Sequence, residues 1–259
     1  MTARQALRFG SLAAVLITAA CTNNFYEVPI ETPIRPTLDV SAFDRVLVAG
    51  FISGGSDDVD ANIETTRLLR SQLRTQSDLR VIDADVLALT DLALRDLIES
   101  GAATLPDNVA AGEAPEIMDE DDIEPYEVFF ANAEYWRGLG EEYQNPLIVT
   151  GSIVFAPYSR SGIVQSDREV FDTFGRRSVV PLREFTERRG FVLRPRFVFI
   201  DGRTGATLHS ETFREEILYS ANQSTAALSS YFELMDRLLP TFLNTLSSQS
   251  VRGTRILLR

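Results

Sequence analysis

The side chains that carry most enzymatic chemistry are scarce in this chain of 259 residues. Cys21 is the only cysteine and His209 the only histidine, and all 25 basic residues are arginine, so the chain has no lysine. A phosphate-binding loop, a kinase and a Schiff-base enzyme each need a lysine, and a zinc site of the usual type needs three or four cysteine or histidine ligands. These functions are excluded, and so is a disulfide within the chain.

The residues before Cys21 are typical of a secretory signal peptide. Two arginines, Arg4 and Arg8, precede an apolar stretch over residues 9–17, and small residues occupy positions 18–20. The apolar stretch is too short to span a bilayer as a mature helix, but it has the length of a signal peptide core. We therefore predict a signal peptide over 1–20, with cleavage between Ala20 and Cys21.

A cysteine directly after that cleavage position resembles the lipobox of bacterial lipoproteins. The resemblance implies that the Cys21 thiolate takes a diacylglyceryl group and becomes the first mature residue. Each buried methylene contributes about 0.8 kcal/mol, so two or three acyl chains hold a protein on a membrane almost irreversibly. In Gram-negative lipoproteins, aspartate directly after the lipidated cysteine is the usual signal for retention in the inner membrane. This chain has Thr22 at that position, which resembles lipoproteins sorted to the outer membrane. A plain secreted protein with an unpaired cysteine is the alternative.

The net charge argues against nucleic-acid binding. The full chain carries −12, and removal of Arg4 and Arg8 with the signal peptide leaves 23 basic against 37 acidic residues, or −14. Contacts to phosphates need a dense positive surface. We expect partners other than nucleic acid.

One segment is basic against this acidic background. Eight arginines lie between residues 176 and 203 with only three acids, a local charge of +5. Arginine matches carboxylate and phosphate geometry, so this segment is a candidate surface for an anionic polymer or an acidic protein. The candidates for this contact are Arg176, Arg177, Arg188 and Arg189. For Arg194 and Arg196 we favour pairing within the domain, because a loop over 202–205 would put Arg196 opposite Glu211.

Four other features allow a functional and a structural interpretation. The glycines at 50, 54 and 55 follow a strand but match no nucleotide-binding motif, so we expect a tight turn. The acids at 119–124 lack the EF-hand spacing, so we expect a solvated loop rather than a metal site. His209 has no nucleophile elbow to serve, so we expect it to pack on a strand. Carboxylates are abundant, which leaves a wall hydrolase with two acids as an alternative. We expect no catalytic residue, metal or cofactor.

Hydrophobic periodicity predicts a mixed sheet with helices, an α/β fold with α+β as the alternative. The expected strands are 45–52, closed by a turn at 53–56, then 79–83, 147–155, an extended stretch over 163–200, a turn at 200–205 and an alternating stretch over 206–219. The expected helices are 61–76, 86–100, an aromatic helix over 126–138 and a closing amphipathic helix over 224–246 that Pro240 kinks or restarts. The first elements form a βαβ start, and the turn at 200–205 closes a long antiparallel hairpin.

This order of elements resembles the periplasmic lipoprotein domains of the TolB N-terminal, LpoB and CsgG-like family. The strings that carry the resemblance are 46–51, 79–83, 149–153 and 200–205, with the helices at 61–76 and at the C-terminal end, over roughly residues 43–250. The resemblance implies an α/β fold used for binding and assembly. We expect a signal peptide over 1–20, a lipidated cysteine and proline-containing tether over 21–41, and a single globular periplasmic domain over 42–259.

The same resemblance implies a second function, a subunit of an oligomeric secretion channel with residues 163–190 as membrane hairpins. Such strands need one apolar face. Ile163, Gln165 and Asp167 share one face, and Val164, Ser166 and Arg168 share the other. Because both faces are mixed, we rank this function below a lipid-anchored, non-catalytic accessory module of the outer membrane that faces the periplasm. Its expected partners are the bilayer, through Cys21, and an envelope protein or the cell wall; a homo-oligomer is an alternative.

Replacement of the cysteine tests the predicted anchor. Cys21→Ser removes the thiolate that accepts the lipid, so the protein should leave the membrane fraction or stay uncleaved. The measurement is fractionation of cells together with the mass of the N-terminal peptide. Membrane retention of a serine variant whose signal peptide has been cleaved would contradict the anchor.

Overall fold

A mixed β-sheet forms the centre of the computed structural model. The model describes residues 25–101, 117–171, 173–220, 223, 225–247 and 249–258, and it divides the chain into two units, 36–247 and 1–35 with 248–259. Cys21, the predicted signal peptide and the acidic residues 107–116 lie outside the described residues.

Seven strands make up the sheet in the described part of unit 36–247, in the order β4-β2-β5-β6-β7. β3 adds to the edge of β5, and β8 adds to the edge of β6. β2, β3, β4 and β5 run parallel to their neighbours, whereas β5, β6, β7 and β8 pair antiparallel. The strands are β2 Arg45–Val48, β3 Ile52–Gly55, β4 Arg80–Val81, β5 Leu147–Phe171, β6 Arg177–Asp201, β7 Thr207–Thr212 and β8 Glu215–Ser220. The expected mixed α/β fold is confirmed. The expected extended stretch over 163–200 is wrong, because the chain turns back between Phe171 and Arg177, so the long antiparallel hairpin is β5–β6 and the turn at 200–205 joins β6 to the short β7.

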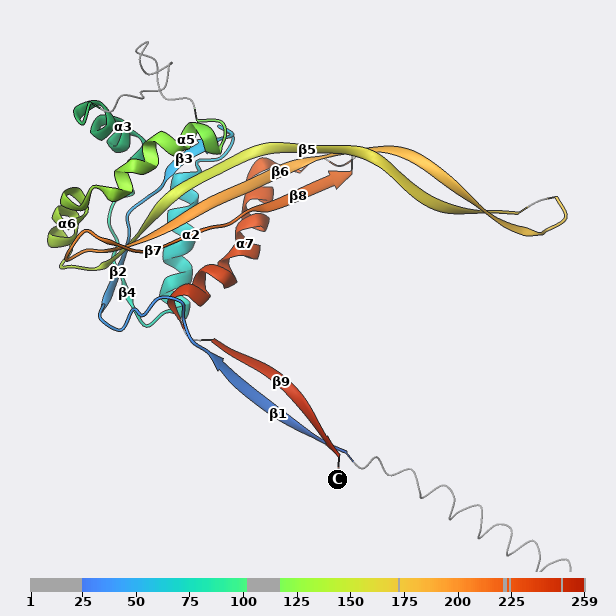
Figure 1. Cartoon of the computed structure of the whole chain (residues 1–259), viewed down its shortest axis with the longest axis horizontal. Coiled ribbons are helices and arrows are strands. Elements are labelled where there is room, and N and C mark those ends of the chain that lie inside the picture. The colour runs from blue at the N-terminus through green and yellow to red at the C-terminus, as the bar shows by residue number, and fades with distance from the viewer. Residues whose placement is uncertain are drawn as a thin grey trace, which may run out of the picture. The chain divides into compact units, whose positions relative to one another are not determined.

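Helices cover both faces of the sheet (Figure 1). α2 Ala61–Gln76 and α7 Ala227–Leu246 pack on one face, and α3 Leu89–Glu99, α5 Glu120–Glu127, the 3-10 helix η1 Val128–Ala131 and α6 Ala133–Glu142 pack on the other. Leu147, Val149 and Phe155 of β5 point to the first layer, and Ile148 and Val154 point to the second. A strand buried on both faces needs apolar residues at successive positions, which explains the continuous apolar run at 147–149.

The two long helices of the first layer meet at a buried hydrogen bond. The hydroxyls of Thr65 in α2 and Tyr231 in α7 contact each other, and the Tyr231 hydroxyl also donates to the carbonyl of Ala61. Burial raises the pKa of Tyr231, so the phenol stays neutral and keeps its proton for these partners. α7 continues through Pro240, which lies on the exposed side of the helix.

The predicted strand over 45–52 is wrong in detail, because strand pairing is interrupted at 49–51, between β2 and β3. Gly50 has a φ of +137°, and a Cβ there would lie 2.7 Å from the carbonyl oxygen of Leu87. The side chain of Asn62 bridges the break, since it accepts from the amide of Phe51 and donates to the Leu87 carbonyl. The glycines at 54 and 55 then lie in strand β3 rather than in the expected turn.

Two further elements differ from expectation. The predicted aromatic helix over 126–138 is interrupted at Asn132, whose side chain accepts from the amide of Tyr135 and begins α6. The alternating stretch over 206–219 is divided at Phe213, where β7 ends and β8 follows. On α2 the apolar Ile63 is 40% exposed, whereas the polar Thr65 and Thr66 are buried.

The second unit is a two-stranded antiparallel ribbon. β1 Phe25–Ile34 pairs with β9 Gln249–Leu258 over ten positions, from Phe25 opposite Leu258 to Ile34 opposite Gln249. Residues 25–34 of the expected tether over 21–41 are extended, as the prolines indicate, but they are paired with the C-terminal residues. The composition of residues 21–41 does not predict this pairing.

The layered core predicts where stability resides. Leu69 in α2 is fully buried between the helices and the sheet, so Leu69→Ala should lower the free energy of unfolding by about 2–5 kcal/mol. Leu182 in β6 is 42% exposed, and Leu182→Ala should change it by less than about 0.5 kcal/mol. Urea unfolding of the two variants measures both values. Equal losses would show that the outer part of β6 is packed like the core.

Candidate functional site

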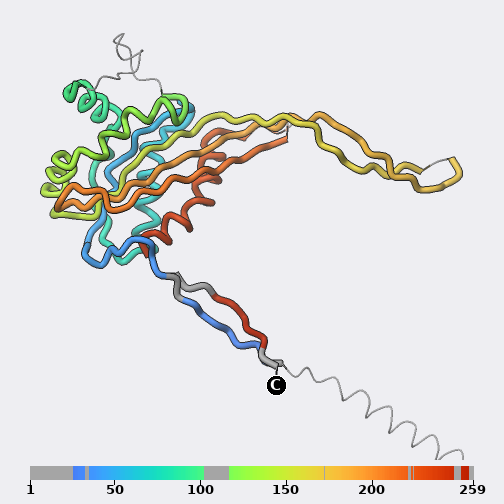
Figure 2. Tube along the Cα trace, in the orientation of Figure 1, coloured from blue at the N-terminus to red at the C-terminus, as the bar shows by residue number. Residues whose placement is uncertain are grey.

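The outer halves of β5 and β6 form a two-stranded arm. We define the arm as residues 158–171 of β5 and 177–190 of β6, which are joined through a turn at the tip. Figures 1 and 2 show it leaving the sheet with no helix along its outer part. At about 3.3 Å per residue the arm is about 45 Å long. The helices of this unit leave its outer part uncovered.

The root of the arm is fixed in the core. Phe155 of β5 is fully buried, stacks on Phe191 of β6 at 4.9 Å between ring centroids, and meets the ring of Tyr231 edge-on. At Gly190 a Cβ would lie 1.9 Å from the carbonyl oxygen of Ile217 in β8, so only glycine fits there. The first core layer therefore sets the direction in which the arm leaves.

Both edges of the arm have unpaired backbone groups. In the described residues, β3 covers the outer edge of β5 only as far as Phe155, and β8 covers the outer edge of β6 only as far as Arg188. A long strand edge with free N–H and C=O groups is a template for pairing with another strand. The arm thus offers two edges to a partner.

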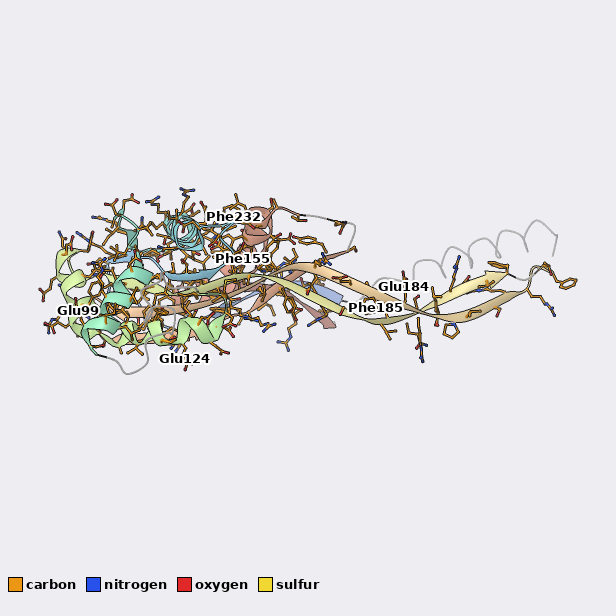
Figure 3. The ribbon with its side chains drawn as sticks, turned by 90° about the horizontal axis from the view of Figure 1, so that it is seen from above. Glu99, Glu124, Phe155, Glu184, Phe185 and Phe232 are labelled. Carbon is orange, nitrogen blue, oxygen red and sulfur yellow. The ribbon has the colours of Figure 1, made fainter. Side chains whose placement is uncertain are left out.

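The faces of the arm are mixed in character. Directly opposite residues share a face, and within 163–171 and 177–185 only the pair Ile163–Phe185 is apolar on both strands. Nine apolar side chains of the arm and its tip are at least 42% exposed: Ile163, Val164, Val170, Phe171, Phe174, Val179, Val180, Leu182 and Phe185. Figure 3 shows side chains, among them Glu184 and Phe185, projecting from the arm into solvent. Neither face is apolar enough to lie against lipid along its length.

The structure does not bring the four candidate arginines into one site. Arg176 and Arg177 are at the tip, and Arg188 and Arg189 are at the root, roughly 36 Å away along the strand. Arg177 pairs with Glu169, Arg189 pairs with Glu187 at 2.8 Å, and Arg176 lies over the Phe174 ring at 5.6 Å. Arg188 lies opposite Arg160 in the register. The arginines are thus distributed along the arm among carboxylates.

Arg194 and Arg196 pair within the domain, as expected, but with other partners. Arg194 approaches Glu120 of α5 at 3.7 Å, and Arg196 binds Glu127 of α5, which also accepts from Ser152. A register shift between Phe199 and Ile200 places Thr212, not Glu211, opposite Arg196. These two arginines hold α5 against the sheet.

The remaining sequence candidates have structural roles. Asp119 accepts from the amides of Asp121 and Asp122 and begins α5 in a capping box, so part of the acidic run is a helix start. His209 packs 5.9 Å from the Phe199 ring and 3.6 Å from Glu211. Among the described residues, no three histidine, cysteine or acidic side chains lie close enough to hold a metal ion.

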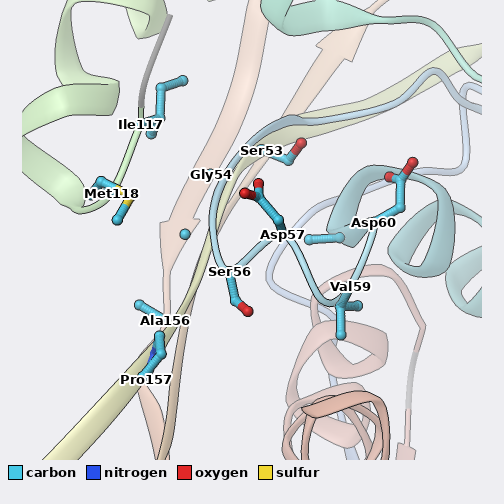
Figure 4. A pocket seen from close by; sticks show the side chains of 12 residues that line it. Ser53, Gly54, Ser56, Asp57, Val59, Asp60, Ile117, Met118, Ala156 and Pro157 are labelled. Atoms are coloured by element: carbon cyan, nitrogen blue, oxygen red, sulfur yellow. The ribbon is translucent and has the colours of Figure 1, made fainter.

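A cavity of about 780 Å³ opens between β3 and the start of α2 (Figure 4). Asp57, at its rim, is exposed, and Asp60 caps α2 by accepting from the amide of Ile63. A Cβ at Gly54 would overlap the Ile117 side chain, so this glycine is required by packing. The cavity holds no basic residue among those that line it, and its acids are solvated or bonded to the backbone.

The exposed aromatic residues of the arm are functional candidates that sequence reasoning missed. Phe171, Phe174 and Phe185 are 64%, 82% and 68% exposed. Neither 163–171 nor 177–185 alternates between apolar and polar residues, so no periodicity marked these phenylalanines. Examination of one strand alone does not show which residues lie side by side.

Comparisons with known proteins add only distant likenesses. No protein-family model matches the chain, and no curated protein matches its sequence. The lipoprotein GNA1162 from Neisseria meningitidis is 12% identical to this chain, with a TM-score of 0.33. The match covers 79% of this chain and 99% of the GNA1162 chain. A chain of a dodecameric PelC variant from Paraburkholderia phytofirmans is 12% identical to this chain, with a TM-score of 0.34. The match covers 83% of this chain and 96% of the PelC chain. In the described residues, no helix is long and apolar enough to cross a membrane.

Proposed function

We propose that the chain is a lipid-anchored accessory protein of the bacterial envelope that binds other envelope components through its arm and catalyses no reaction. The single observation that carries the proposal is the arm, with two uncovered strand edges and exposed aromatic side chains. Folded proteins usually protect such edges with charge, prolines or a covering element, and an uncovered one is suited to strand addition. The predicted acylation of Cys21 holds the domain at the outer membrane, facing the periplasm.

The chemistry of the arm indicates the kind of partner. It presents exposed aromatic and branched side chains together with arginines, and aromatic residues and arginine are enriched in protein interfaces. An extended strand of an envelope protein could bond to either edge and seat its side chains beside Phe185 or Phe171. A wall enzyme with two carboxylates remains the weaker proposal, since the acids at the cavity are solvated or engaged in capping.

Site-specific photocrosslinking in intact cells tests this role. A photoreactive phenylalanine analogue at Phe185, 68% exposed on the arm, should form a discrete protein adduct. The same analogue at Val128, 65% exposed on η1, is the matched control and should form at least several-fold less. Equal adduct yields at Phe185 and Val128 would contradict a partner on the arm. So would the absence of any adduct when the analogue is placed at Phe185 and, in a separate variant, at Phe171.

A second candidate function, a subunit of an oligomeric secretion channel, is favoured by the charges on the two strands. On one face, β5 carries Asp167 and Glu169 while β6 carries Arg177 and Arg183; on the other face, β5 carries Arg168 and β6 carries Glu184. The outer edge of β6 in one copy is therefore complementary to the outer edge of β5 in the next. Antiparallel pairing of copies would repeat this complementarity around a ring.

Charge reversal with mixing tests the oligomer. R177E/R183E makes this face of both strands acidic, and D167R/E169R makes it basic, so each full-length variant alone should fail to assemble. A mixture of the two should assemble, because an acidic edge then meets a basic one between copies. Native mass spectrometry in detergent gives the masses. A monomeric wild type, or an oligomer that neither variant weakens, would retire this candidate.

A further inference from the structure

The β1–β9 ribbon begins very close to the predicted anchor. Phe25, the first residue of β1, follows Cys21 by four residues, which span at most about 14 Å when fully extended. Antiparallel pairing places Leu258, at the end of β9, opposite Phe25. When Cys21 is acylated, this end of the ribbon must therefore lie at the headgroup layer of the bilayer.

One face of the ribbon, the apolar face, has a single charged residue, Arg255, among its described side chains; the other, the charged face, carries Glu27, Glu31 and Arg252 but also Ile256, which is 61% exposed. Tyr26, Val28 and Ile30 alternate along β1 on one face and are 56%, 38% and 37% exposed. Glu27 and Glu31 occupy the other face, where Glu31 accepts from Arg252 of β9 at 2.7 Å. Alternation of this kind is what a strand pair needs to lie on an apolar surface with its charges in water.

The residue types near the anchored end are those of a membrane interface. Tyr26, near the anchored end, lies on the apolar face, opposite Leu257 in the register, whereas Phe25 and Leu258 are at register positions of the other face. Aromatic side chains are enriched at the headgroup level, and arginine reaches from an apolar contact to the headgroups. Arg255, opposite Val28 and exposed, lies on the apolar face where it can contact lipid phosphate.

An isolated two-stranded ribbon is only marginally stable in water. Its strands are not joined by a turn, since Ile34 and Gln249 are far apart in the sequence. A surface that covers the apolar face would stabilise the pairing, and the bilayer is the surface that the anchor brings within reach.

We propose that the face of the ribbon bearing Tyr26, Val28 and Ile30 lies on the lipid interface and is a second membrane contact beside the acylated Cys21. This proposal rests on the proposed lipid anchor. The C-terminal strand then has a function, because it holds the segment next to the anchor in the extended form that presents these side chains.

Quenching by brominated lipid tests which face contacts the bilayer. Val28→Trp places an indole on the apolar face, and Thr254→Trp places one at the same level on the charged face; Trp136, fully buried, is a constant background. The full-length lipoprotein is reconstituted in vesicles of phosphatidylethanolamine and phosphatidylglycerol containing a brominated phosphatidylcholine. Quenching should be at least about twofold stronger for Val28→Trp, because bromine acts only over short distances.

Ile30→Trp and Glu31→Trp repeat the comparison at a second level, in case one replacement disturbs the pairing. Equal quenching in both pairs, or stronger quenching on the charged face, overturns the proposal. The mass of the N-terminal peptide is measured on the same samples and reports acylation separately. If Cys21 proves unacylated, the anchor fails, and coupling its thiol to a maleimide lipid places the chain on the same vesicles so that the face is still determined.

Discussion

The antiparallel ladder between β5 and β6 is the constraint on which the rest of the structure depends. Each strand is 25 residues long, and the pairing follows one register from Leu147–Asp201 to Phe171–Arg177. Nearly half of the ladder is buried between two helical layers, and the rest is the arm. Because side chains alternate strictly, packing of Phe155 and Leu193 in the core decides which face carries Phe185, Asp167 and Arg183 many residues away.

Much of the fold could be predicted because burial leaves a clear pattern. The helix over 61–76, the apolar run at 147–155 and the turn at 201–205 are encoded locally, by periodicity, by an acid at the helix start and by glycines. The break at Gly50 could not be predicted, since it depends on Leu87 and Asn62 from other elements. The same holds for Asn132, a helix start inside an aromatic run, and for β9, whose partner strand is at the other end of the chain.

The candidate site shows a different limit. The sequence identifies an arginine-rich segment. It does not show that these arginines are spread along one extended strand over tens of ångströms. Arg196 was expected opposite Glu211, and one shifted position in the hairpin replaced that partner with Glu127 on a helix. The residue types therefore predict the charge of the segment. Whether its arginines form one binding cluster or a series of separate ion pairs depends on the strand register, which the residue types do not give.

The rooted hairpin also has a mechanical consequence. The turn between Phe171 and Arg177 joins β5 and β6 covalently, so a load applied at the tip pulls both strands together and does not separate their hydrogen-bonded pairs. A pull along the strand axis is therefore carried into the sheet, where the hydrogen bonds between β5 and its neighbours β2 and β3 share the load. The arm thus transmits tension from its tip to the buried sheet rather than opening from the tip.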